Sequence, residues 1–229
     1  MRSPVGMEKI INSAFDFFAY ALPGAFLILS LLLLDAQNDT CADFLDFAQS
    51  LKTGSGILLL ALGYVLGFAV TPLGRILYRA FNRGRFFRWL DSFLEGDLKK
   101  KTYRFDETHA GAPKMSVSER FILVREYSPN NFRHIESWHV YSLMSHNMAL
   151  VNILVVLFII FRLFFYDSDS PWLWGVGMAG AACLAILFLY SAVKFNIWST
   201  NELNATVESL RLTERALEWP APTESPRPS

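Results

Sequence analysis

The chain has 229 residues, of which 52% are hydrophobic and 18% are charged, and its formal net charge at pH 7 is zero. An average soluble domain is about 25% charged, and here the apolar residues come in long continuous blocks. The composition excludes a disordered chain, a collagen-like chain and a disulfide-dense scaffold. The blocks are typical of an integral membrane protein and argue against a wholly soluble enzyme.

Four apolar blocks are long enough to cross the hydrocarbon core of a bilayer, which takes about 20 residues as a helix. Because these blocks are continuous rather than alternating, they predict helices and not strands. We therefore expect an all-α protein with four membrane-spanning helices, a cytosolic helical segment between the second and third spans, and an extended C-terminal helix. The spans are predicted at 14–34, 56–78, 147–166 and 171–193.

The connections between the spans differ in the sign of their charge. The segment from Arg75 to Met144 holds thirteen Lys and Arg against eight Asp and Glu. The connection 35–55 holds four Asp against one Lys, and the turn 167–170 holds two Asp and no base. Since Lys and Arg near the span ends stay in the cytosol, segment 79–146 and both termini are expected there. The two acidic connections are expected to face outward.

Small residues recur on one face of the second and fourth predicted spans. Gly63 and Gly67 form a G-x-x-x-G pattern, which lets two helices approach closely in lipid. Such a face serves packing within one bundle or between the subunits of a homo-oligomer, and the sequence leaves both open. The residues assigned to helix packing or oligomerisation are Gly56, Gly63, Gly67, Gly74, Gly175 and Ala179.

Three polar residues lie in or beside the predicted spans. Asp16 follows Ser13 at capping-box spacing and is expected at the start of the first helix, with a proton or ion site as the alternative. Arg162 is expected to reach the outer interface and meet the acidic turn 167–170. Asn152 is expected to form a hydrogen bond between helices.

Residues 76–97 predict a basic, aromatic helix that Gly84 interrupts. Its position directly after a span favours contact with the inner membrane surface over contact with nucleic acid. The arginines expected to contact lipid are Arg79, Arg83, Arg85 and Arg88.

Two further helices are predicted before the third span. Ser116 and Glu119 fit a capping box that opens a helix to about Tyr127. From Phe132 the pattern predicts a helix that continues into the third span as a cytosolic stalk.

The stalk carries the most polar cluster of side chains. Glu136 is three residues from both Arg133 and His139, and His146 lies one heptad beyond His139. Neighbours at this spacing share a helix face. A pH-responsive or partner-binding face is one hypothesis, and a solvated or intrabundle polar face is the other. The chain has no H-E-x-x-H, so neither a metal nor a cofactor is expected.

A C-terminal helix is predicted over 194–219. Leu203, Leu210 and Leu217 recur every seven residues, which favours pairing with another helix, such as one in the cytosolic segment of the same chain. Residues 220–229 hold four prolines and are expected to form a disordered tail.

Residues 15–24, Phe-Asp-Phe-Phe-Ala-Tyr-Ala-Leu-Pro-Gly, resemble the opening of small bacterial inner-membrane proteins that begin F-D-x-x-x-Y-x-x-P-G. The layout of spans with a cytosolic insert is similar too. Some proteins of this kind serve phage defence, as in the membrane subunit of the Kiwa system. The resemblance implies a bacterial inner-membrane sensor with a cytosolic effector partner, and it carries over no functional residue.

The sequence holds no Walker loop, G-x-G-x-x-G, G-x-S-x-G or C-x-x-C motif. We therefore expect a non-enzymatic, oligomeric membrane protein that acts as a sensor, scaffold or effector. Its expected partners are membrane lipid, further copies of the chain and a cytosolic protein, and not nucleic acid. A pore or ion channel is the alternative, and a membrane-embedded enzyme is the third hypothesis.

Overall fold

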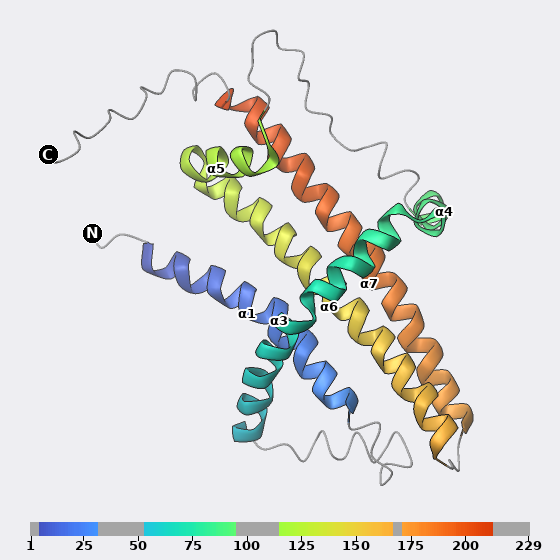
Figure 1. The fold of residues 1–229 in the computed structure, drawn as a ribbon. Helices are drawn as coiled ribbons and strands as arrows, with labels where there is room; N and C mark the ends of the chain where they lie inside the picture. The colour runs from blue at the N-terminus through green and yellow to red at the C-terminus, as the bar shows by residue number, and fades with distance from the viewer. Residues whose placement is uncertain (1–4, 32–52, 95–114, 167–170, 213–229) are drawn as a thin grey trace, which may run out of the picture. The chain divides into compact units, whose positions relative to one another are not determined.

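The structure is a computed structural model, and it describes residues 5–31, 53–94, 115–166 and 171–212. This part of the chain is all-helical, which confirms the predicted fold class (Figure 1). Its helices are α1 (Val5–Leu31), α3 (Thr53–Arg83), α4 (Arg85–Leu94), α5 (Val117–Tyr127), α6 (Pro129–Phe165) and α7 (Pro171–Ser209).

Among the described helices, α3, α6 and α7 are long and apolar enough to cross a membrane. A shorter apolar stretch, Phe17–Leu31, lies in α1. On α3 the side chains of Ile57, Val65 and Phe68 are each more than three-fifths exposed, which is the surface that lipid covers in a membrane protein. The four-span count and the orientation stay predictions. The acidic connections fall largely or wholly outside the described residues.

The chain divides into two compact units. Unit 1 comprises Met1–Asp97 and His139–Asn196, and unit 2 comprises Leu98–Trp138 and Ile197–Ser229. Because α6 and α7 cross these boundaries, each of the two helices contributes residues to both units.

Within unit 1, α1 and α3 approach each other at glycine. A Cβ atom added at Gly67 would lie 1.9 Å from the backbone oxygen of Tyr20, and one at Gly24 would lie 1.8 Å from the oxygen of Gly63. Only the absence of side chains lets these backbones touch. The close approach offered by the G-x-x-x-G pattern is thus used inside the chain.

The other small residues of the predicted packing faces differ in their surroundings. Gly74 of α3 packs against α6, where an added Cβ would lie 2.9 Å from Asn147 Oδ1. Gly56 and Gly175 have open space around them, and Ala179 is exposed.

Helices α6 and α7 also pack together in unit 1. The buried residues Val155, Ile159, Trp174 and Ala181 form one apolar cluster. Several turns away along both helices, Ser142 Oγ donates a 2.8 Å hydrogen bond to the carbonyl oxygen of Ala192. This bond fixes one helix against the other by a buried polar contact.

Unit 2 has a core of its own, built from α5, the parts of α6 and α7 that belong to this unit, and Leu212 just beyond α7. Its buried members are Val124, Ile135, Leu203, Val207 and Leu212. Leu203 and Val207 share one face of α7, and this face packs with Val124 of α5 and Ile135 of α6. The repeat position Leu210 is only partly buried beside this core, and the cytosolic location of the segment stays a prediction. The predicted repeat position Leu217 lies outside the described residues.

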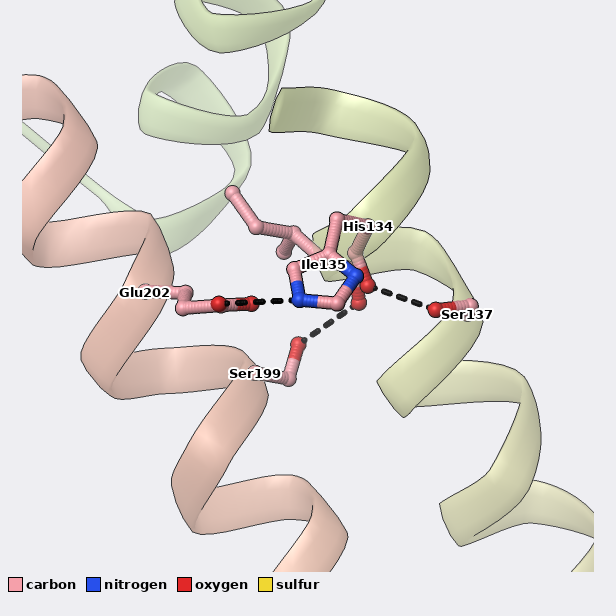
Figure 2. A network of polar contacts seen from close by, with 5 residues as sticks. All are labelled: His134, Ile135, Ser137, Ser199 and Glu202. Atoms are coloured by element: carbon pink, nitrogen blue, oxygen red, sulfur yellow. Dashed lines mark hydrogen bonds and ion pairs between the residues drawn. The ribbon is translucent and has the colours of Figure 1, made fainter. Parts of the chain in front are cut away.

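A polar network also joins α6 and α7 in unit 2 (Figure 2). Ser199 Oγ donates to the carbonyl oxygen of Ile135 at 3.2 Å, and His134 Nε2 lies 3.2 Å from Glu202 Oε1. Ser137 Oγ donates to the carbonyl oxygen of His134 at 2.7 Å. These contacts tie the stalk histidine His134 to α7.

Several helix ends follow the predicted signals. The break at Gly84 separates α3 from α4, and α5 begins after Ser116 and ends at Tyr127, as predicted. The capping box is present, with Glu119 N donating to Ser116 Oγ at 3.2 Å.

Other helix ends were predicted wrongly. α1 begins at Val5 and passes through Ser13, which therefore does not cap it. α6 begins at Pro129 rather than Phe132, because the fixed φ of proline suits the first position of a helix. α7 ends at Ser209, short of residue 219, and Arg211 beyond it has a φ of 49°.

The capping box gives unit 2 a pH-dependent contribution to stability. Hydrogen bonds from the backbone and side chain of Ser116 lower the pKa of the Glu119 carboxyl. A lowered folded-state pKa stabilises the fold at pH values above the ordinary carboxyl pKa, and this contribution is lost as the pH falls through the lowered value.

We therefore expect Glu119→Gln to lower the melting temperature of unit 2 slightly at pH 7. The difference from the wild type should vanish at acid pH, where Glu119 is protonated. Thermal unfolding at a series of pH values measures this, with the exposed Glu126→Gln as the matched control. A difference that persists unchanged in acid would contradict the role of the carboxylate.

Candidate functional site: a basic pocket in unit 1

A pocket of roughly 360 Å³ opens in unit 1 among α3, α6 and α7. It is lined mainly by polar and cationic side chains, and no Asp or Glu is among the lining residues that the structure describes. The lining residues are Arg75, Tyr78, Arg79, His139, Ser142, Leu143, His146 and Asn196.

Helix periodicity brings these side chains together. Arg75 and Arg79 are four residues apart on α3, so they lie on one face, and both are exposed. On α6, His139 and His146 are seven residues apart, with Ser142 between them, and they share a face in the same way. The pocket forms where these two faces meet.

His146 is held firmly at the inner wall of the pocket. His146 is only 6% exposed, and its ring forms a hydrogen bond with the backbone of Ser142. The ring lies 5.9 Å from the ring of Tyr78, and its Cδ2 lies 3.0 Å from the position of a Cβ added at Gly74. Its Nε2 atom is buried and has no hydrogen-bond partner among the described residues. This ring nitrogen is therefore left unsatisfied by the described residues.

A buried hydrogen bond joins α6 to α3 next to His146. Asn147 Nδ2 donates to Thr71 Oγ1 at 3.0 Å, and Thr71 Oγ1 donates to the carbonyl oxygen of Gly67 at 2.8 Å. Asn147 is fully buried. The pair fixes the register of α3 against α6 at the level of His146.

A second hollow, of roughly 420 Å³, adjoins the first on α1 and α3. The two hollows share Arg75 and Arg79. The rest of the second hollow is largely apolar and aromatic: it is lined by Tyr20, Phe68, Thr71, Pro72 and Ile76 besides the two arginines. The arginines therefore stand between a polar hollow and an apolar one.

Helix α4 has two contrasting faces. Phe87 and Asp91 are buried, and Asp91 Oδ1 accepts a hydrogen bond of 3.4 Å from the hydroxyl of Tyr190 on α7. Phe86, Trp89 and Phe93 are exposed and stack in sequence, with ring centroids 5.7 and 6.2 Å apart. An exposed aromatic row beside arginines is typical of a helix at a membrane interface.

The structure separates the four arginines predicted to contact lipid. Arg79 lines the basic pocket, whereas Arg83, Arg85 and Arg88 are exposed outside it. Their contact with lipid stays a prediction.

The stalk residues also divide between two places. His139 and His146 line the pocket of unit 1, His139 exposed and His146 buried. Arg133 and Glu136 belong to unit 2 and are partly buried there. The four residues therefore do not form one face within a single unit.

The polar residues predicted in the spans have local partners. Asn152 donates a 2.8 Å hydrogen bond to the carbonyl oxygen of Met148, within its own helix, and not between helices as predicted. Arg162 is 1% exposed, and its guanidinium carbon lies 4.8 Å from the ring centroid of Trp174. This cation–π contact accompanies its burial. The turn 167–170 and the side chain of Asp16 lie outside the described residues.

Most of the pocket is not evident from the sequence. Arg75 and Tyr78 lie at the end of a predicted span, and no local motif marks Ser142, Asn147 or Asn196. The seven-residue spacing of His139 and His146 was visible in the sequence. The helix that this face contacts was not visible in the sequence, because periodicity within α6 does not specify which other helix packs against it.

The chemistry available in the pocket is recognition of an anion. Two guanidinium groups, two imidazoles and amide or hydroxyl groups are all groups that bind phosphate or carboxylate. No group of three or more His, Cys, Asp or Glu side chains suited to a metal occurs among the described residues. No family model matches the chain, and neither a curated protein nor a solved structure matches it.

Proposed function

We propose that this chain is an integral membrane protein that works by binding and not by catalysis, as a membrane sensor or scaffold. In this proposal the pocket of unit 1 takes the signal, and the helical unit 2 engages a cytosolic protein. A homo-oligomer in a bacterial inner membrane, with a role in phage defence, is the extension that rests on the resemblance of residues 15–24.

One observation carries the proposal. Helices α6 and α7 each contribute to the pocket of unit 1 and, further along the same helix, to the core of unit 2. A rigid helix is a physical route by which a shift at one site changes another. His146 of the pocket and Ile135 of the unit 2 core are three turns apart on α6. A ligand that shifts α6 at the pocket can therefore change the packing of unit 2, and this favours a binding sensor.

The proposal is tested by breaking the α6–α7 contact in unit 1 and observing unit 2. Ser142→Ala removes the hydrogen bond to Ala192, a loss of about 1 kcal/mol or about fivefold in an opening equilibrium. We expect amide hydrogen exchange in α5 to accelerate by a similar factor. Ser30→Ala is the matched control, because the Ser30 hydroxyl donates only to Phe26 in its own helix.

Two results would contradict the proposal. Unchanged exchange in α5 of the Ser142→Ala protein would show that unit 2 does not respond to unit 1. A reproducible ion-selective current from liposomes containing the purified protein would favour the pore. We expect ion flux no greater than in protein-free liposomes.

A further inference from the structure

We propose that the paired hollows at Arg75 and Arg79 bind one anionic phospholipid whose headgroup carries a phosphate and a free hydroxyl, such as phosphatidylglycerol. This inference rests on the proposed function, because it names the ligand that the sensor pocket takes.

The charge of the pocket selects an anion. Arg75 and Arg79 line both hollows, and among the described residues no carboxylate lines either one. Two guanidinium groups one turn apart can hold two oxygens of the same phosphate, since each offers paired N–H donors. A zwitterionic headgroup would bring an ammonium group next to these cations, and like charges repel.

The buried imidazole selects the hydroxyl. One ring nitrogen of His146 is engaged by the Ser142 backbone, and Nε2 is buried, without a partner among the described residues. In the neutral ring whose other nitrogen carries the proton, Nε2 is an acceptor, so it suits an O–H donor. A buried acceptor left without a partner is costly, and a headgroup hydroxyl would satisfy it.

The second hollow distinguishes a lipid from a soluble phosphate. Tyr20, Phe68 and Ile76 give it an apolar wall beside the same two arginines. The Phe68 and Ile76 side chains are both 63% exposed on α3, so the hollow is open to the surface that lipid covers. An acyl chain can lie against this wall while the phosphate meets the arginines.

The test measures lipid binding to the full-length protein in detergent by native mass spectrometry. Phosphatidylglycerol and phosphatidylcholine with identical acyl chains are the two probes. We expect the wild type to prefer phosphatidylglycerol at least tenfold. The double variant Arg75→Gln/Arg79→Gln should bind it about 10- to 30-fold more weakly, as expected for two cation contacts. The matched control is Arg125→Gln, which removes an exposed arginine of unit 2 that lines neither hollow and should bind as the wild type does.

Two further arms test the hydroxyl and the source of the phosphate. His146→Phe removes the Nε2 acceptor and should reduce the preference for phosphatidylglycerol over phosphatidic acid, which lacks the glycerol hydroxyls. Glycerol 3-phosphate at millimolar concentration should not displace the lipid. If glycerol 3-phosphate displaces the lipid, the proposal of a lipid ligand is overturned and the pocket is assigned to a soluble phosphate.

Equal binding by the wild type and the Arg75→Gln/Arg79→Gln protein would overturn the inference. A thermal melt shows whether the double variant is folded. If it is unfolded, the preference of the His146→Phe protein for phosphatidylglycerol over phosphatidic acid decides the inference. The outcome is separable from the proposed function. Loss of lipid preference with an intact response of α5 to Ser142→Ala refutes only the ligand, and the converse result refutes only the sensor.

Discussion

Replacing Gly67 by alanine is expected to destabilise the protein more than any other single methyl addition to α3. The new Cβ would lie 1.9 Å from the backbone oxygen of Tyr20, and a backbone atom cannot move aside as a flexible side chain can. Overpacking typically costs about 1–3 kcal/mol, and the direct backbone clash places this case at or above the upper end. The melting temperature in detergent should fall by roughly 6 °C or more.

The matched control for Gly67→Ala lies on the same helix. Gly56→Ala adds the same methyl group where nothing lies within 4 Å, and it removes a glycine from the first turn of the same helix. Since alanine is the better helix former, this variant should melt at or slightly above the wild-type temperature. Equal melting temperatures for the two variants would show that α1 and α3 do not meet at Gly67.

The second large effect is expected at Phe87, which attaches α4 to the rest of unit 1. Phe87 is fully buried, and its ring lies 5.9 Å from Tyr190 and 5.6 Å from Phe81. Truncation of a buried phenylalanine costs about 3–5 kcal/mol. Phe87→Ala should therefore lower the melting temperature by roughly 6 °C or more and leave the α4 amides open to hydrogen exchange.

Phe93→Ala is the control of the same residue type on the same helix. Phe93 is 77% exposed, so its truncation should leave the melting temperature in detergent nearly unchanged. If α4 lies at the membrane interface, Phe93→Ala should instead reduce protection of α4 from exchange in lipid nanodiscs. A large loss of stability from Phe93→Ala in detergent would contradict the assignment of the two faces.

The sequence anticipated the features that depend on short-range physics. Continuous apolar blocks specify helices, because only a helix satisfies its backbone hydrogen bonds within one segment. The capping box at Ser116 and Glu119 and the break at Gly84 were likewise visible, since each depends on residues no more than a few positions apart. The extension of α1 back to Val5 was missed, because a local cap motif at Ser13 does not stop a helix that can continue through it.

The sequence alone thus determined the all-helical class and the apolar helices, and the seven-residue repeat that begins at Leu203 indicated that α7 pairs with another helix. Tertiary structure decided what these helices pack against. The face containing Gly67 meets α1, Gly74 meets α6 beside Asn147, and Arg75 and Arg79 meet the histidine face of α6. Periodicity specifies which residues share a face, but the partner of that face depends on the shape and chemistry of segments distant in sequence. The basic pocket exists only where two such faces converge, and so only the folded chain could show it.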